Sequence, residues 1–351
     1  MLSGMALCRT RNCRFMMGED GRRMRKCVLL LYQPCHLSTN SKPKSMLSLI
    51  ASKAKYANEK YEHFLERKFP NFYLLYSTFM KGFRMLMTEA KEVGRIKQRM
   101  NHQGIPFHQL PYREMEKLRQ FRRDIIKAAP VVIISIPPFA NYLVFVLMYF
   151  FPRQLLIRHF WTPKQREEFL DIYHRMRVEA YPEILDGLLN AVPKLSERNL
   201  RNQMFQLCTQ VQHGTHPQVE NLHAVCTAFS GPPLGMKRLD VQQMKALSRV
   251  MFLTPHLPAF LLQHRLGSHI CEIQNLDCAL LKLGVNELSE EELKRACYIR
   301  GLNSTHLSRE DCETWLHCWL QLSSMLKVSE ASLLLHCMVL LSANYLQSIK
   351  Q

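Results

Sequence analysis

The chain has 351 residues, enough for one or two folded domains, and its 47% hydrophobic and 22% charged residues are ordinary for a packed protein. Only 13 glycines are present, which argues against an architecture of strands and tight turns. The net charge of +18 is unevenly placed: residues 1–127 carry +16, residues 128–151 carry no charged side chain, and residues 152–351 carry +2. The 12 cysteines form no C-x-x-C pair and exclude a small secreted disulfide scaffold, so we expect reduced thiols.

Residues 1–45 form a basic arm that contains few acids. Arginines and lysines recur between Arg9 and Lys26, whereas Glu19 and Asp20 are the only acids before residue 58. This composition is typical of a mitochondrial transit peptide, and a disordered basic tail with a nuclear address is the alternative. Residues 46–127 then predict a basic amphipathic helical region, which would lie on a membrane surface or pack on the rest of the protein.

Residues 128–151 predict a transmembrane helix. The 24 uncharged residues would extend about 36 Å, against a hydrocarbon core of about 30 Å. Pro137 and Pro138, followed by Phe139, predict a kink near its middle. Asn141 would need a polar partner inside the bilayer, which the kinked backbone can supply. Six basic residues at 108–127 against four at 152–171 favour an inward N-terminal side by a small margin.

Residues 152–351 read as a succession of amphipathic helices without the alternating pattern of strands. Helix starts are predicted at four capping signals: Thr162 with Pro163 and Gln165, Ser196, Ser289 with Glu292, and Ser308 with Asp311. We expect Trp315, Leu316, Trp319 and Leu320 on the inner face of one helix. The sequence therefore predicts an all-α domain.

Motifs of catalysis and metal binding are not found in the sequence. We find no phosphate-binding loop, H-E-x-x-H, G-x-S-x-G or EF-hand loop. We therefore expect no catalytic residue, no cofactor and no metal site, and we predict that the chain is not an enzyme.

Three stretches resemble the LETM family of mitochondrial inner-membrane proteins, in particular its short animal members. Residues 82–86 look like an aromatic segment that precedes the membrane, and residues 113–124 with Pro138-Phe139 look like the family's membrane-entry signature. The third stretch looks like an LT-x-x-EL-x-x-AC-x-x-RGM motif with a structural role, carried here by Leu288, Ser289, Glu292, Leu293, Ala296, Cys297, Arg300 and Gly301.

The resemblance implies a single transmembrane helix in the mitochondrial inner membrane, followed by a 14-3-3-like, ribosome-binding-like helical domain in the matrix. This orientation is opposite to the one that the small charge bias favours, and we adopt the orientation that the resemblance implies. Its long members are linked to cation/proton exchange, mitochondrial volume and respiratory-complex assembly. Those members carry an acid just after the Pro-Phe pair, where this sequence has Asn141, and a proline where it has Phe145. An amide cannot carry a proton, so the departure argues against transport.

Three functions are compatible with the sequence. The first is a membrane-anchored interaction protein that supports mitochondrial organisation, respiratory-complex biogenesis and ion and volume homeostasis. Its partners would be the mitochondrial ribosome, respiratory-complex assembly components or a second copy of the chain. The second is a cation/proton antiporter or a subunit of one. The third is a SAP-like nucleic-acid-binding role for residues 289–321, opposed by their acidic side chains.

Basic side chains within the helix predicted at 236–252 are candidates for partner binding, because ribosomal RNA attracts basic surfaces. A solvated helix face is the alternative interpretation. The four candidates are Lys237, Arg238, Lys245 and Arg249. We expect the protein in the mitochondrial inner membrane, with the outer membrane or a nuclear pool as alternatives.

Overall fold

The computed structural model describes residues 67, 70–135, 150 and 157–345. The chain divides into two compact units, Met1–Tyr73 and Leu74–Gln351, and nearly all described residues belong to the second. The described part is helical and contains no strand, which confirms the all-α prediction there. Its elements are α3 (Pro70–Gln103), η1 (Phe107–Gln109), α4 (Tyr112–Ser135), η2 (Arg158–Phe160), α7 (Pro163–Val178), α8 (Tyr181–Ala191), η3 (Val192–Lys194), α9 (Arg198–Gln212), α10 (Val219–Ala224), η4 (Cys226–Phe229), α11 (Val241–Val250), α12 (Ala259–Leu283), η5 (Val285–Glu287), α13 (Glu290–Ile299), α14 (Arg309–Met325), η6 (Val328–Glu330) and α15 (Ser332–Leu340).

Reciprocal capping boxes start three of the four helices predicted from capping signals. Thr162 caps α7, Ser289 caps α13 and Ser308 caps α14, each with the predicted third residue bonding back. The prediction for Ser196 is wrong: α9 begins at Arg198, and its N-cap makes no side-chain hydrogen bond. Glu197 keeps an extended backbone (φ −85°, ψ 127°) and is the N-cap, so the helix starts one residue later than Ser196 would predict.

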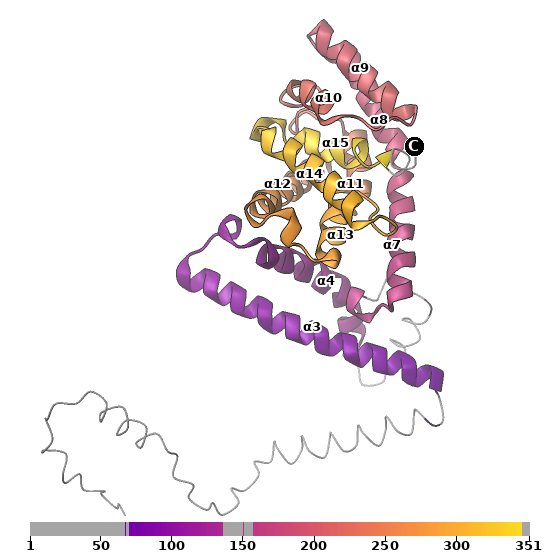
Figure 1. Ribbon diagram of the computed structural model, residues 1–351, viewed down its shortest axis with the longest axis vertical. Coiled ribbons are helices and arrows are strands. Elements are labelled where there is room, and N and C mark those ends of the chain that lie inside the picture. The colour runs from indigo at the N-terminus through magenta and orange to yellow at the C-terminus, as the bar shows by residue number, and fades with distance from the viewer. Residues whose placement is uncertain (1–66, 68–69, 136–149, 151–156, 346–351) are drawn as a thin grey trace, which may run out of the picture. The chain divides into compact units, whose positions relative to one another are not determined.

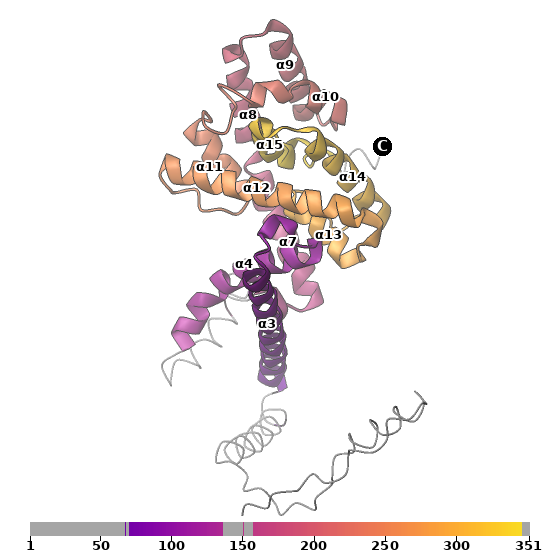
Figure 2. The same ribbon diagram turned by 90° about the vertical axis from the view of Figure 1, so that its left-hand side faces the viewer.

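Helix α14 presents its predicted apolar face to the core. Trp315, Leu316, Trp319 and Leu320 are all buried, and the two indole rings stack at 5.7 Å between centroids. Helix α15 is buried along its whole length. Helix α12 crosses the middle of the unit and packs against α4, α11, α14 and α15 (Figure 2).

Helices α3 and α4 form an antiparallel hairpin at one end of this unit (Figure 1). Lys117 of α4 lies 2.5 Å from Glu92 of α3, and Glu114 pairs with Arg99 one turn earlier on α4. The paired residues rise in number along α4 and fall in number along α3, so the two helices run antiparallel. The hairpin thus brings the basic region before the predicted membrane segment onto the helical unit.

The first half of α4 is part of the main hydrophobic core. Tyr112 and Met115 are fully buried within it. Arg119, itself buried, lies 3.4 Å from Glu272 of α12. Arg113 donates to Glu292 of α13 at 3.0 Å, which joins two of the family-like stretches. The core of the helical unit therefore includes residues that precede the predicted membrane segment as well as those that follow it.

Much of the predicted membrane segment lies outside the described residues. Helix α4 runs through Ala128 to Ser135, whereas residues 136–149 and 151–156 are not described, and Pro137, Pro138, Phe139 and Asn141 fall among them. The predicted transit peptide at 1–45 also lies outside the described residues. Among helices that the structure does describe, none combines the length and apolar character that a membrane crossing requires.

Candidate functional site

One face of α3 approaches the short element η2 closely. Gly82, Leu86, Glu89 and Val93 follow one another at spacings of three and four residues, so they share this face. A Cβ atom on Gly82 would lie 2.4 Å from the ring of Phe160 and 2.7 Å from the carbonyl oxygen of His159. The absence of a side chain at residue 82 therefore permits the contact between α3 and η2.

A small apolar cluster, separate from the main core, holds this junction together. Leu86 of α3 packs with Ile157 and Phe160, and all three side chains are buried. Phe121 and Ala128 of α4, together with Trp161, pack around them. Residues from both sides of the predicted membrane segment therefore meet in one cluster.

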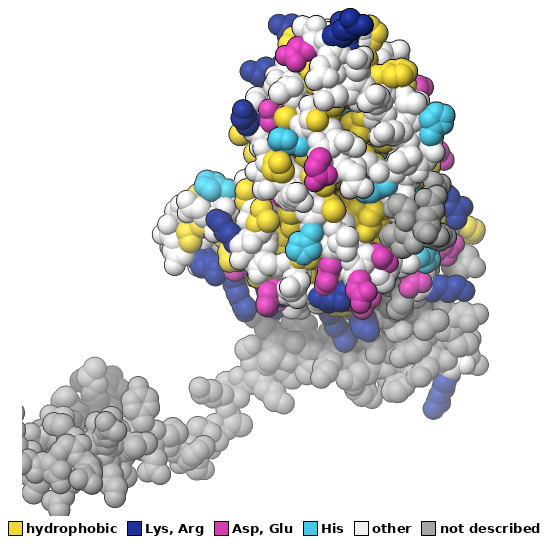
Figure 3. All heavy atoms as spheres, turned by 45° about the horizontal axis from the view of Figure 1, so that its top comes forward, with side chains coloured by type: hydrophobic (Ala, Val, Ile, Leu, Met, Phe, Trp, Pro, Cys, Tyr) yellow, Lys and Arg dark blue, Asp and Glu magenta, His cyan; other side chains and the backbone are white. Residues whose placement is uncertain are grey.

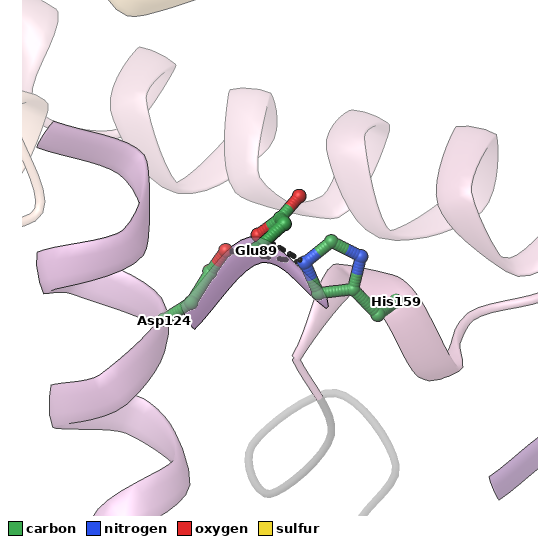
Figure 4. Close-up of side chains that lie close together, drawn as sticks. All are labelled: Glu89, Asp124 and His159. Carbon is green, nitrogen blue, oxygen red and sulfur yellow. Dashed lines mark hydrogen bonds and ion pairs between the residues drawn. The ribbon is translucent and has the colours of Figure 1, made fainter. Parts of the chain in front are cut away.

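Glu89, Asp124 and His159 converge beside this apolar cluster (Figure 4). They come from α3, α4 and η2 respectively. The Nε2 atom of His159 lies 2.9 Å from Oε2 of Glu89 and 3.9 Å from Oδ2 of Asp124. One potential ligand atom from each residue lies within 4.8 Å of the others. The imidazole therefore hydrogen-bonds to Glu89, with the Asp124 carboxylate nearby but beyond hydrogen-bond length.

The surroundings shift the pKa values of the Glu89 and Asp124 carboxyl groups in opposite directions. Burial raises the pKa of Asp124, although Arg158 and His159 oppose this effect. Burial also acts to raise the pKa of Glu89, but the hydrogen bond and charge of His159 outweigh it and lower that pKa. Arg158 lies 3.7 Å from Asp124, beyond hydrogen-bond length. The Oδ2 atom of Asp124 is buried and makes no hydrogen bond in the described part of the chain.

This arrangement can bind a cation or hold a proton between two carboxylates. The sequence predicted no metal site, and the three residues were not singled out together because 35 residues separate each from the next. Asp124 was noticed only as part of the family-like entry signature. The sequence carried only a positional signal that could have found them: charged and ionisable side chains flank an uncharged run, and they meet only if its two flanks come together.

The residues of the third family-like stretch have structural roles. Leu288, Leu293, Ala296 and Cys297 are buried in the core, and Ser289 with Glu292 forms the capping box of α13. Arg300 is completely buried beside Asp277. Gly301 has a φ of +115°, in the region that favours glycine. The stretch therefore ends one helix and ties it to α12.

The four candidate partner-binding residues have different environments. Lys237 and Arg238 are exposed in the turn before α11, and Lys245 is half-buried. Arg249 is exposed and already pairs with Glu183 of α8. Lys237 and Arg238 therefore offer the more available positive charge.

The described fold and site define an all-α protein in which a helical core is joined to the flanks of an apolar segment. Residues 110–340 match the family model described as LETM1-like, RBD. The chain is 56% identical over 313 residues to bovine LETM1 domain-containing protein 1, covering 89% of this chain and 87% of that protein. Identity to the human protein of that name is 55% over 311 residues, covering 89% and 86%. The chain belongs to the LETM1-like family.

A more distant relative is the Mitochondrial proton/calcium exchanger protein of Drosophila melanogaster. It is 25% identical over 264 residues, which cover 74% of this chain and 26% of the fly protein. Most of the fly protein therefore lies outside the aligned region.

Proposed function

We propose that the chain is a mitochondrial interaction protein anchored to the inner membrane by residues 128–151, with its helical unit in the matrix. The unit would bind the mitochondrial ribosome or a respiratory complex under assembly, and so support mitochondrial organisation and ion and volume homeostasis. The proposal includes the transit peptide at 1–45 and a 14-3-3-like arrangement of the helices. In this proposal the protein acts by binding its partners and catalyses no reaction.

The observation that carries the proposal is the attachment of the apolar segment to the helical unit at both ends. Before the segment, α4 is fixed to the core through the buried Arg119 and its partner Glu272. After it, Ile157 and Phe160 pack on α3. A domain fixed to both flanks of an apolar segment would be held at the membrane surface in a defined orientation.

The contacts between the flanks bear on topology. Lys127, at the start of the predicted segment, lies 3.3 Å from the hydroxyl of Tyr173 and 4.9 Å above the Trp161 ring. Asp124 and Arg158 meet at 3.7 Å. A single crossing would place these flanks on opposite faces of a bilayer about 30 Å thick. Their proximity favours flanks that lie on the same side, in place of the single crossing expected from the sequence.

Exposed apolar side chains near the segment support membrane contact. Phe83, Met85 and Met87 of α3 and Ile125 and Ile126 of α4 are all at least 41% exposed. Arg84 lies between Phe83 and Met85, and Lys81 lies two residues before Phe83. Large apolar side chains interspersed with basic ones are typical of helices at a lipid headgroup boundary.

Partner binding is proposed for the exposed basic pair Lys237 and Arg238. Figure 3 shows acidic and basic side chains interspersed on one face of the molecule, so no single-sign field dominates that view. Contacts of Lys237 and Arg238 with phosphate groups would make their binding to a partner sensitive to salt.

Sedimentation of detergent-solubilised mitochondria at low and high salt tests this role. We expect the protein to migrate with ribosomal particles at low salt and to leave them at high salt. The double variant Lys237→Glu/Arg238→Glu should lose co-migration, whereas the matched control Lys194→Glu/Arg198→Glu, on η3 and α9, should retain it. Absence of co-migration for the wild type at every salt concentration would refute ribosome binding.

Cation/proton exchange is the second candidate. The name of the fly relative and the two carboxylates beside His159 favour it, whereas Asn141 at the family's acidic position opposes it. Reconstitution into liposomes tests it through cation-driven proton flux. Equal flux from wild type and Asn141→Leu would remove Asn141 from any pathway, and no flux from the wild type would reject exchange.

A further inference from the structure

We infer that Glu89, Asp124 and His159 form a binding site for one divalent transition-metal cation of the Zn²⁺ class. The site would lie where α3, α4 and η2 meet. The inference does not depend on ribosome binding or ion exchange, but it requires both flanks of residues 128–151 to lie on the same side of the membrane, because Asp124 precedes that segment and His159 follows it.

The donor set fits this class of cation. One imidazole nitrogen and two carboxylate oxygens are ligands that Zn²⁺ accepts, and three protein ligands leave the fourth tetrahedral position for solvent. Ligand atoms about 2.0–2.1 Å from a tetrahedral zinc stand about 3.3 Å apart. The distances from His159 Nε2, 2.9 Å to Glu89 and 3.9 Å to Asp124, lie on either side of that value. Small side-chain adjustments would complete the geometry.

Asp124 supplies an independent indication of a ligand. Its side chain is only 8% exposed, yet Oδ2 makes no hydrogen bond in the described part of the chain. A buried carboxylate oxygen without a hydrogen bond is costly, and a cation would satisfy it. The same oxygen is the atom of Asp124 nearest to His159 Nε2, so it faces the other two candidate ligands.

The surrounding residues hold the candidate ligands in place. Glu89 and Asp124 lie on long helices, and Gly82, Leu86 and Phe160 set the distance between α3 and η2. Ligands on helices that are fixed by packing give more precise sites than ligands on loops. The three groups therefore meet without any rearrangement of the backbone.

Arg158 is the cationic group that competes for this position. Its guanidinium lies 3.7 Å from Asp124, and its side chain is 30% exposed. A bound divalent cation would replace Arg158 as the counter-charge of Asp124, and the partly exposed arginine side chain can turn toward solvent. Removing that guanidinium should therefore strengthen metal binding.

Titration of the purified full-length chain in detergent with Co²⁺ and Zn²⁺ tests the inference. Co²⁺ reports its ligands by absorption, since thiolate ligands add intense charge-transfer bands that nitrogen and oxygen ligands do not. We expect one equivalent of Co²⁺ without thiolate bands, displaced by one equivalent of Zn²⁺. His159→Gln and Asp124→Asn should each weaken affinity at least about 100-fold, since even residues behind metal ligands cost 10–100-fold. Arg158→Gln should increase affinity.

The matched control is His306→Gln. His306 lies 3.0 Å from Asp171 and forms a histidine–carboxylate pair to which the described residues add no third ligand, so its loss should leave the stoichiometry unchanged. Circular dichroism of each variant establishes that it is folded, and Glu89→Gln provides a third ligand variant. Thiolate bands in the wild type, no binding by the wild type, or equal affinity of folded Asp124→Asn and wild type would each overturn the proposal.

Discussion

The guanidinium of Arg300 and the carboxylate of Asp277 form an ion pair that is enclosed within the helical core. The Nε atom of Arg300 donates to Oδ1 of Asp277 at 2.8 Å, and the side chains are 0% and 2% exposed. The other carboxylate oxygen accepts from Trp319 at 3.1 Å and from Ser323 at 2.6 Å. This pair joins α12 to α14 and to the end of α13, so it fixes the three helices relative to one another.

Replacing Asp277 with leucine should strongly destabilise the protein. The change leaves the Arg300 charge buried without a counter-charge, which typically costs about 3–5 kcal/mol. Urea unfolding followed by the fluorescence of the buried tryptophans Trp315 and Trp319 measures this free energy. The matched control Glu183→Gln removes the partly exposed partner of Arg249, and should cost less than about 1 kcal/mol. Equal losses from the two variants would refute the structural role assigned to the buried pair.

Gly301→Ala should destabilise the protein because residue 301 has a φ of +115° and a Cβ there would lie 2.4 Å from the carbonyl oxygen of Met338. Backbone strain alone is worth about 1–3 kcal/mol, and the overlap adds to it. Gly267→Ala in α12 is the control, since among the described residues an added Cβ there meets no atom within 4 Å outside its own helix backbone. Helix propensity should make that variant about 0.5–1 kcal/mol more stable. Thermal unfolding that ranks the two variants in the opposite order would contradict this geometry.

Gly82→Ala should loosen the contact between α3 and η2, because the added methyl group would overlap Phe160 and the backbone of His159. Gly94→Ala, on the same helix with nothing near its Cβ, should be neutral or slightly stabilising. Limited proteolysis reports the difference as faster cleavage near residue 160 in Gly82→Ala only. Identical cleavage rates in both variants would show that the two segments do not depend on this close approach.

Acidification should destabilise the protein partly through His336. This side chain is fully buried: Nδ1 lies 2.8 Å from the Ser332 carbonyl oxygen, and Nε2 lies 3.1 Å from the Gln243 amide nitrogen. Burial lowers the pKa of His336 to about 4, so the unfolded chain binds the proton first as the pH falls. Its stabilising contribution is complete above the unfolded pKa of about 6.5 and is lost as the pH falls toward 4, roughly 3 kcal/mol in all.

The pH dependence is measured as the free energy of unfolding at several pH values between 7 and 4. His336→Gln should flatten the profile relative to wild type, whereas His306→Gln, which changes an exposed histidine, should change it much less. Parallel profiles for wild type and His336→Gln would mean that His336 is not the titrating group.

Local sequence signals predicted much of the helical architecture. The capping boxes at Thr162, Ser289 and Ser308 start helices where expected, because a cap depends on residues only three positions apart. The apolar spacing around Trp315 and Trp319 correctly identified a buried face. The prediction at Ser196 failed by one residue, because Glu197 keeps an extended backbone and is the N-cap of α9, without a side-chain hydrogen bond.

Long-range relationships could not be predicted from local patterns. The Arg300–Asp277 pair joins positions 23 residues apart, and the Glu89, Asp124 and His159 group depends on three segments packing together. His159 follows an apolar run that suggested a crossing to the other side of a membrane, so its proximity to α3 had no local signal. Among the residues that the structure describes, the candidate site was therefore found through tertiary contacts rather than motifs.

The most direct test of the account is the side of the membrane on which each flank of the apolar segment lies. Cleavage sites for a specific protease would be inserted at Gly104, in the exposed turn after α3, and at Val328, which is 89% exposed. We predict that a matrix-targeted protease cuts both sites, and that protease added to mitoplasts cuts neither. Cleavage of the two sites from opposite sides would establish a single crossing and contradict the packing of the flanks, and cleavage of both from the intermembrane space would contradict the matrix location.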